Sequence, residues 1–209
     1  MKHIKLFESF EDIDSICKKY GIQNYTINPD GSVDFDGDVD LSNLKLTKLP
    51  LKFGRVSGDF YCQFNQLTTL EGSPREVGGD FNCDVNKLTT LEGSPREVGG
   101  DFNCTHNKLT TLEGAPREVG GDFYCSYNQL YTLKGLPRIR WDFSLRDNPV
   151  YAIYVLFKKR KVFMDSLDWD YIRRDKETKQ NQIVKSRFEE ACAEVGIEVP
   201  ESIEGYEYI

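Results

Sequence analysis

The chain has 209 residues with 39% hydrophobic and 29% charged residues, a composition typical of a soluble globular protein. Its formal net charge of −7 at pH 7 argues against nucleic acid as a partner, because phosphate binding requires a basic face. No apolar run reaches the length of about 18 residues that a membrane span requires. The first residues also lack the apolar core of a secretory signal, so we expect a cytoplasmic protein without a membrane partner.

A helix and a hairpin are expected to cap the N-terminal end, over residues 1–37. Apolar residues recur at helical spacing and stop before Gly21: Leu6, Phe7, Phe10, Ile13, Ile16 and Cys17. Residues 32–41 then alternate between apolar and polar around Asp36 and Gly37, which predicts a hairpin. The same stretch is rich in aspartate, but a calcium loop needs an acidic ligand at its twelfth position, where Asn43 stands.

A 21-residue unit follows, with copies that begin at Leu67, Leu88 and Leu109 and read L-T-T-L-E-G-[SA]-P-R-E-V-G-G-D-F-[NY]-C-x-x-N-[KQ]. Self-similarity at a short fixed period is typical of a solenoid, in which each coil buries its apolar face against its neighbours. Within a unit, residues 80–84 alternate with period two, which predicts a short strand with Phe81 and Cys83 inside. Degenerate copies extend the solenoid to about six coils over residues 38–150.

Two inward columns are expected to form a structural ladder. One contains Cys62, Cys83, Cys104 and Cys125, and the other contains Asn65, Asn86, Asn107, Asn128 and Asn148. A straight row of sulfurs about 4.8 Å apart cannot converge on one zinc ion, so we interpret the cysteines as buried thiols. A buried asparagine can bond the backbone of adjacent coils, and stacking repeats that bond along the axis. We predict no metal site and no cofactor.

The last part of the chain, residues 151–209, is expected to form a helical C-terminal cap. Apolar residues at helical spacing predict a short helix: Tyr151, Ile153, Tyr154, Leu156 and Phe157. A second helix is expected over about residues 180–195, with Ile183, Phe188 and Cys192 on its buried side.

The pattern F-x-C-x-x-N-x-L resembles the L-x-L-x-x-N-x-L core of leucine-rich repeats, with Phe and Cys in two of the Leu positions, over residues 31–150. This resemblance implies an α/β repeat solenoid of short repeats, with a parallel concave sheet, an extended or 3₁₀ convex side and helical caps. The arc L-x-x-L-x-x-x-P resembles units of bacterial effector proteins, but nothing here matches their ubiquitin-ligase domain. The repeat sequence L-T-T-L-E-G-S-P-R-E-V-G-G-D-F resembles that of uncharacterised leucine-rich-repeat proteins of large tailed bacteriophages. This resemblance implies a phage-encoded protein in the host cytoplasm.

The outward residues of the strands are the candidate partner-binding site, on the concave face that the resemblance implies. They are Tyr61, Phe64, Asp80, Asn82, Asp101, Asn103, His106, Asp122, Tyr124, Tyr127 and Arg146. Near-identical copies that differ mainly at outward positions indicate a fixed scaffold under a changing surface, and Tyr, Phe, His and Arg are favoured at interfaces. Neutral drift at exposed positions is the alternative.

The aspartates of this set belong to a row that repeats in every unit, which leaves two interpretations open. Either each carboxylate bonds turn amides, such as those of the adjacent glycine pair, and serves the fold, or the row is an acidic strip for a basic partner or a cation. Residues that build the fold are expected to repeat, whereas binding residues are expected to differ between copies.

The leading hypothesis is a non-enzymatic module that captures an unidentified host or viral protein. One alternative is a packaged or structural capsid protein, because residues 1–8 are similar to the short leader of some phage internal proteins. The other alternative is a metal-dependent enzyme that uses the acidic strip, although no nucleophile–base pair or phosphate-type glycine loop accompanies it. The sequence does not indicate an oligomeric state.

Overall fold

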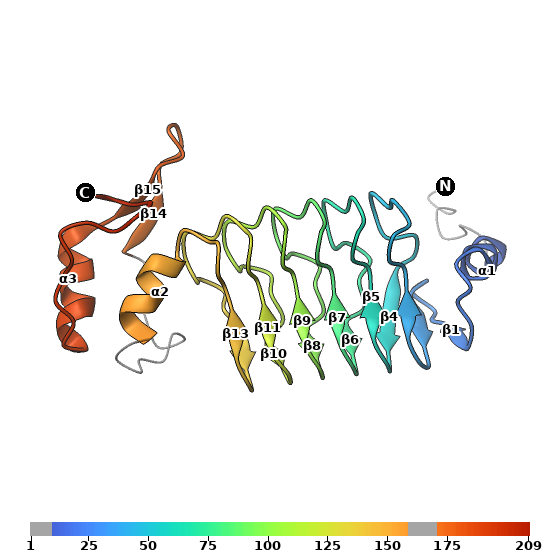
Figure 1. The fold of residues 1–209 in the computed structure, drawn as a ribbon. Coiled ribbons are helices and arrows are strands. Elements are labelled where there is room, and N and C mark those ends of the chain that lie inside the picture. The colour runs from blue at the N-terminus through green and yellow to red at the C-terminus, as the bar shows by residue number, and fades with distance from the viewer. Residues whose placement is uncertain (1–9, 159–170) are drawn as a thin grey trace, which may run out of the picture.

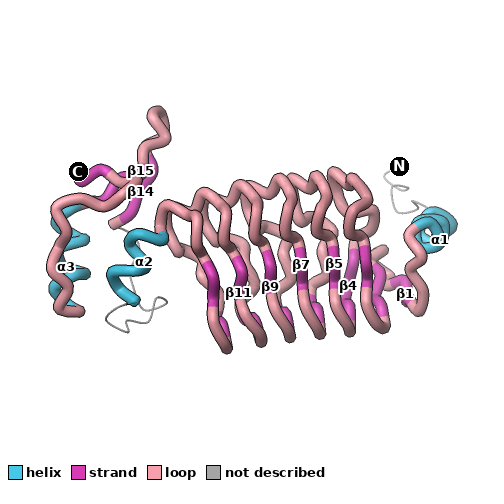
Figure 2. The backbone as a smooth tube through the Cα atoms, in the orientation of Figure 1, coloured by secondary structure: helices cyan, strands magenta, loops and turns pink. Residues whose placement is uncertain are grey.

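The chain forms a β-solenoid with helices at both ends, and the computed structural model describes residues 10–158 and 171–209 (Figure 1). The coils stack in a row, and most of each coil is loop, with strands confined to two short segments (Figure 2). The prediction of a repeat solenoid with parallel stacked strands is confirmed. The leader-like start, with Leu6 and Phe7 of the predicted helix, lies outside the described residues.

A six-stranded parallel sheet contains the strands that the repeat predicts. These are β3 (Val39–Asp40), β5 (Phe60–Tyr61), β7 (Phe81–Asn82), β9 (Phe102–Asn103), β11 (Phe123–Tyr124) and β13 (Phe143–Ser144). Phe81 pairs with Phe60 on one side and Phe102 on the other, so equivalent residues of successive coils lie side by side. Each row of residues along the solenoid axis therefore contains the residues that occupy the same position in successive repeats.

A second sheet of seven strands covers another side of the coils and was not predicted. Its strands are β1 (Tyr25–Ile27), β2 (Val33–Phe35), β4 (Phe53–Val56), β6 (Glu76–Val77), β8 (Glu97–Val98), β10 (Glu118–Val119) and β12 (Arg138–Ile139). Only β1 runs antiparallel to its neighbour, β2. Strands β6, β8, β10 and β12 lie in the arc that was expected to be extended or 3₁₀, and each has only two residues, too few for alternation to reveal it.

The hairpin predicted for residues 32–41 is wrong. Its two halves, β2 and β3, lie in different sheets, and each pairs in parallel with the next coil. Gly37 is instead the first member of a column of corners between the sheets, because the N–H of Gly58 donates to the carbonyl oxygen of Gly37 over 3.1 Å, and the N–H of Gly79 donates to that of Gly58 over 2.9 Å. A hairpin and this corner give the same alternation of apolar and polar residues around Asp36 and Gly37, so the sequence pattern does not distinguish them.

Stacked phenylalanine rings form the centre of the solenoid. Phe60, Phe81, Phe102 and Phe123 are fully buried. Their successive ring centroids are 5.3–5.4 Å apart, and the planes of neighbouring rings lie within 10° of each other. The leucines of each unit, such as Leu88 and Leu91, are also fully buried. Every coil therefore contributes the same apolar layer, and removal of that layer from water is the main force that holds the coils together.

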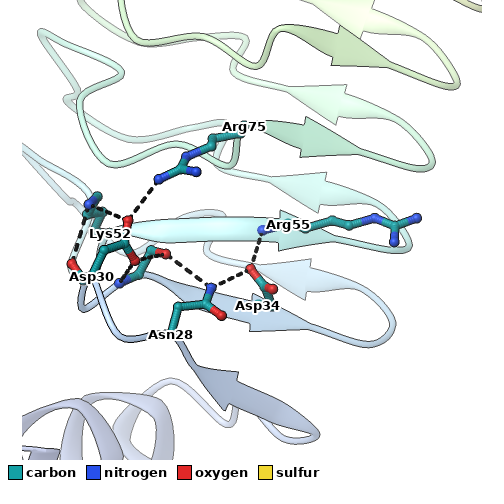
Figure 3. A network of polar contacts seen from close by, with 7 residues as sticks. Asn28, Asp30, Asp34, Lys52, Arg55 and Arg75 are labelled. Carbon is teal, nitrogen blue, oxygen red and sulfur yellow. Dashed lines mark hydrogen bonds and ion pairs between the residues drawn. The ribbon is translucent and has the colours of Figure 1, made fainter.

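The N-terminal end is closed by α1 (Phe10–Lys19) and β1, and a polar network ties it to the following coils (Figure 3). The Asp30 carboxylate accepts hydrogen bonds from the Ser32 hydroxyl over 2.6 Å and the Ser32 N–H over 3.0 Å. It also pairs with Lys52 at 3.0 Å and Arg75 at 2.8 Å. The bonds from Ser32, and then the Lys52 ammonium, hold the pKa of Asp30 well below its ordinary value of 3.8.

An Asp30→Asn substitution tests this network through the pH dependence of stability. A folded-state pKa below the unfolded value means that ionised Asp30 stabilises the fold above the unfolded pKa, and that this contribution is lost as pH falls toward the folded pKa. We expect wild type to be more stable than the variant near neutral pH, with a difference that shrinks below about pH 4. Urea unfolding of both proteins across this range measures the difference, and a difference that is independent of pH contradicts the assignment.

The C-terminal end is closed by α2 (Tyr151–Lys158), which starts where the helix was predicted and packs Tyr154 edge-on against Phe143 with ring centroids 5.0 Å apart. Beyond it, a three-stranded sheet contains β14 (Ile172–Arg174), β15 (Asn181–Ile183) and β16 (Glu207–Tyr208). The second predicted helix is only partly right, because residues 181–183 form β15 and α3 spans Lys185–Glu194. Ile183 is buried as a strand residue, a role that its apolar character fits equally well.

Candidate functional site

The outer face of the six-stranded sheet carries four rows of side chains, with one residue per coil in each row. The carboxylate row contains Asp38, Asp59, Asp80, Asp101, Asp122 and Asp142; the strand row contains Tyr61, Asn82, Asn103, Tyr124 and Ser144; the third row contains Gln63, Asp84, Thr105, Ser126 and Arg146; and the bend row contains Phe64, Val85, His106 and Tyr127. All eleven residues predicted as a partner-binding site lie on these rows. The structure therefore brings them onto one face.

The carboxylate row bonds the coils to one another through the backbone. The Oδ1 atom of each aspartate accepts the N–H of the aspartate in the next coil, at 2.7–2.9 Å along the whole row. This differs from the expected bonds to turn amides of the glycine pair. Because each bond joins successive coils, the repetition of aspartate in every unit has a structural cause.

The hydrogen-bond partner of the second carboxylate oxygen, Oδ2, differs along the row. Asp59 and Asp122 accept the hydroxyls of Tyr61 and Tyr124 on Oδ2, over 2.7 and 2.9 Å. These bonds raise the pKa of each tyrosine to about 12. In the two coils between them, Asn82 and Asn103 take the place of tyrosine, and each amide oxygen accepts a backbone N–H two residues further on. Within the described residues, Oδ2 of Asp80 and Asp101 therefore has no protein donor.

The bend row has an unfavourable backbone conformation for its residue types. Phe64, Val85, His106 and Tyr127 have φ angles of 56°, 48°, 52° and 54°, in the left-handed region. A side chain with a Cβ atom is disfavoured there, most of all a β-branched one such as Val85. Such residues cost of order 1–3 kcal/mol each and persist only where the surrounding structure imposes them. Here the chain must turn sharply after the strand to bring the next asparagine inward.

The ends of the same row show which residues this bend favours. Asn43 and Asp147 occupy the equivalent position in the first and last coils, with φ angles of 59° and 57°. Asparagine and aspartate tolerate the left-handed region better than other residues with a side chain. The four central coils therefore carry bulky residues at a position where the backbone favours small polar ones.

These bulky side chains are exposed and lie close together. Phe64 and Tyr127 are each 51% exposed and Val85 is 36% exposed. The rings of His106 and Tyr127 stack in parallel, with centroids 4.4 Å apart and planes within 5°. The result is a continuous apolar and aromatic stripe beside the polar rows of the sheet.

The third row adds two groups that sequence reasoning placed outward but did not assign to the site. Within the described residues, Oε1 of Gln63 and Oδ1 of Asp84 are buried and have no hydrogen-bond partner. Burial raises the pKa of Asp84, and the nearby His106 opposes that shift. The two residues are adjacent in their row and lie beside the bend row. The only feature of the sequence that could have identified these two residues was the change from Gln to Asp at one repeat position.

Arg146 lies at the margin of the face rather than in its centre. It lies two residues after β13, the last strand of the sheet, and lines a cavity of about 520 Å³ together with Tyr151 and Tyr154 of α2. Its backbone carbonyl accepts the N–H of Tyr127 over 2.9 Å, so the two residues are neighbours in successive coils. The side chain is exposed and has no acidic partner within the described residues.

The asparagines of the structural ladder hold the bend in place from inside. Asn107 donates through Nδ2 to the carbonyl oxygens of Cys83, Cys104 and Thr105 over 3.1–3.2 Å, and its Oδ1 accepts the N–H of Leu88 over 2.9 Å. Asn65, Asn86, Asn128 and Asn148 make the corresponding bonds. All five are buried.

The cysteines of the ladder lie within the apolar core. Cys62, Cys83, Cys104 and Cys125 are fully buried, and each carries a free thiol. Burial raises the pKa of these thiols well above the ordinary value of 9.0. A protonated thiol is a poor nucleophile and a poor metal ligand, so these side chains act as apolar packing groups.

Fold and face together define a β-solenoid whose six-stranded sheet presents an acidic row, tyrosines and a strained aromatic stripe. No protein-family model matches the chain, and no curated protein or solved structure matches it. Within the described ranges, no group of three or more His, Cys, Asp or Glu residues is placed to hold a metal ion. None of the described helices combines the length and apolarity needed to cross a membrane.

Proposed function

We propose that the protein is a non-enzymatic recognition module that binds another protein on the outer face of the six-stranded sheet. The bend row carries this proposal. Its four central residues are exposed and occupy left-handed backbone positions that favour asparagine or aspartate, the residues found at both ends of the row. A fold under no other requirement gains stability from Asn at these positions. Retention of Phe, Val, His and Tyr is explained by contacts that their side chains make with a partner.

The partner that suits this face carries basic groups next to apolar ones. Asp80 and Asp101 offer carboxylate oxygens without a protein donor, one coil apart, in the middle of the face. The aromatic stripe supplies anchors of the type that dominate binding energy at protein interfaces. A lysine or arginine that reaches the carboxylates also comes close to tyrosine rings, which favour cations over their faces.

We further propose that the chain is a leucine-rich repeat protein of the kind encoded by large tailed bacteriophages, with this face as its concave side. The support is the F-x-C-x-x-N-x-L pattern, in which the asparagine bonds three carbonyl oxygens at the end of each strand. The proposed partner is then a bacterial or viral protein in the host cytoplasm.

A triple variant, Phe64→Asn, Val85→Asn and Tyr127→Asn, separates recognition from folding. Asn suits the left-handed backbone, so we expect the free energy of unfolding to rise by roughly 0.5 kcal/mol per site. We expect the variant to lose the proteins that immobilised wild type captures from bacterial lysate. Added salt should release those proteins from wild type, because exposed charge contacts are screened.

The matched control is a triple variant on the other sheet, Glu76→Gln, Glu97→Gln and Glu118→Gln, which also changes three exposed residues in one row. It should capture the same proteins as wild type. The proposal fails if the triple Asn variant captures them equally well, or if both variants lose them together.

A further inference from the structure

A cavity of about 370 Å³ lies between the last coils and the C-terminal sheet, away from the recognition face. One wall comes from the arcs that connect the two sheets and contains Thr111, Thr132 and Lys134. The other wall contains Arg173 of β14 and Arg187 of α3. In Figure 1, β14 stands beside the loops of the last coils. The cavity volume falls within the range of about 300–1,000 Å³ that is usual for small-molecule sites.

The charge of this cavity is opposite to that of the whole chain. Three cationic side chains and one carboxylate, Glu113, line it, whereas the chain carries a net charge of −7. Lys134 pairs with Glu113 at 3.2 Å. Arg173 and Arg187 are exposed and make no ion pair or side-chain hydrogen bond with any described residue. Two arginines with unused donors therefore face one small cavity.

The helix that carries Arg187 adds to the positive potential. Arg187 is in the first turn of α3, which contains no acidic residue, and the preceding Val184 provides no side-chain cap. The N-terminal N–H groups of a helix carry a partial positive charge that attracts anions. Arg187 is the residue of this first turn that lines the cavity, so the helix end favours the same negatively charged ligand as the two guanidinium groups.

The threonines on the solenoid wall supply hydroxyl donors. The Oγ1 of Thr111 accepts the N–H of Glu113 over 3.4 Å, and the Oγ1 of Thr132 accepts the N–H of Lys134 over 3.3 Å. Each oxygen is used as an acceptor, so its hydroxyl hydrogen remains available to donate. Thr132 is only 4% exposed, and it lines the cavity together with Thr111.

We propose that this cavity binds the phosphate group of a small molecule. Guanidinium and hydroxyl donors match the acceptor oxygens of phosphate, and arginine binds this group with two parallel hydrogen bonds. A phosphate alone is smaller than the cavity, so the remaining space holds the organic part of a phosphate monoester. The ligand contacts both the solenoid and the C-terminal sheet, and it should stabilise the packing between them.

The test uses the full chain with inorganic phosphate and glucose 6-phosphate as probes, followed by ³¹P NMR titration and thermal unfolding. We expect saturable binding of both probes, tighter for the ester, and a rise in the unfolding temperature. An Arg173→Gln, Arg187→Gln variant should bind at least about tenfold more weakly, because it loses two charge-assisted contacts. Both side chains are exposed, so the variant should unfold like wild type without ligand.

An Arg96→Gln, Arg117→Gln variant is the matched control, because these two arginines are exposed in the solenoid and line neither this cavity nor the recognition face. Its affinity for both probes should equal that of wild type. Equal weakening in both variants overturns the site, as does the absence of saturable binding to wild type. Tighter binding of malonate than of either probe overturns the ligand class.

Discussion

Asn107→Ala is expected to lower the free energy of unfolding by about 3–5 kcal/mol. The substitution removes the acceptor of the buried Leu88 N–H, and it removes one donor from three carbonyl oxygens that each keep a second donor. A buried N–H left without an acceptor costs about 1–3 kcal/mol, and the loss of the bonds to the three carbonyl oxygens adds to that cost. Urea unfolding followed by circular dichroism measures the loss.

Two further variants define how the loss arises. Asn107→Asp keeps the oxygen that accepts the Leu88 N–H but places a carboxylate oxygen against three carbonyl oxygens, so we expect it to be at least as destabilising at neutral pH. Asn103→Ala in the same coil removes one bond to the Thr105 N–H on the outer face, which is worth about 1 kcal/mol or less. Equal losses for Asn107→Ala and Asn103→Ala contradict the role of the asparagine ladder as a buried set of bonds that stabilises the coils.

Gly99→Ala is expected to lower the free energy of unfolding by about 3–5 kcal/mol through a steric clash. A Cβ atom at this position lies 2.2 Å from the carbonyl oxygen of Gly78 in the preceding coil. That oxygen belongs to the backbone, so relief requires the two coils to move apart. Separation in turn weakens the contacts of Phe81 with Phe102, whose ring centroids are 5.3 Å apart. Thermal and urea unfolding both report the loss.

Gly31→Ala is the control for the chemical change alone. Gly31 has a φ angle of +76° and no atom within 4 Å of the added Cβ. The free energy of unfolding of this variant should fall only by the cost of placing alanine in a left-handed conformation, about 1 kcal/mol. If both variants lose the same free energy, then backbone conformation rather than the close approach of coils explains the repeated glycine pair.

The repeat made the solenoid predictable, because near-identical units show which positions stay apolar. Phe81, Cys83 and Leu88 could be placed inside from the period alone, and all three are fully buried. Most of the second sheet could not be found in this way, because strands such as Glu76–Val77 have only two residues, too few for alternation to be recognised. The hairpin prediction failed for a related reason. Alternation identifies the two faces of a strand but not the sheet to which the strand belongs.

The sequence predicted some features of the candidate site and missed others. Alignment of the repeats identified the outward residues, yet it left the aspartates between a structural and a binding interpretation. The structural interpretation holds for Oδ1 of Asp80, which bonds the next coil, whereas a binding role for Oδ2, which has no described protein donor, stays a prediction. The left-handed bend was not predictable, because Phe64 and Val85 are residue types that disfavour it. Asp84 was missed because its burial depends on packing between coils.

The spacing of the coils limits which elongated partner fits the face proposed for recognition. Successive residues of the bend row are about 4.8 Å apart along the axis, whereas an extended chain advances about 3.3 Å per residue. The two spacings coincide only when three residues of such a partner span two coils, at roughly 10 Å. Phe64 and His106 are two coils apart, and so are Val85 and Tyr127. If the face binds an elongated partner, as proposed, this match favours a chain that presents every third residue on one side, as a polyproline II helix does, because residues three apart in a β-strand face opposite ways.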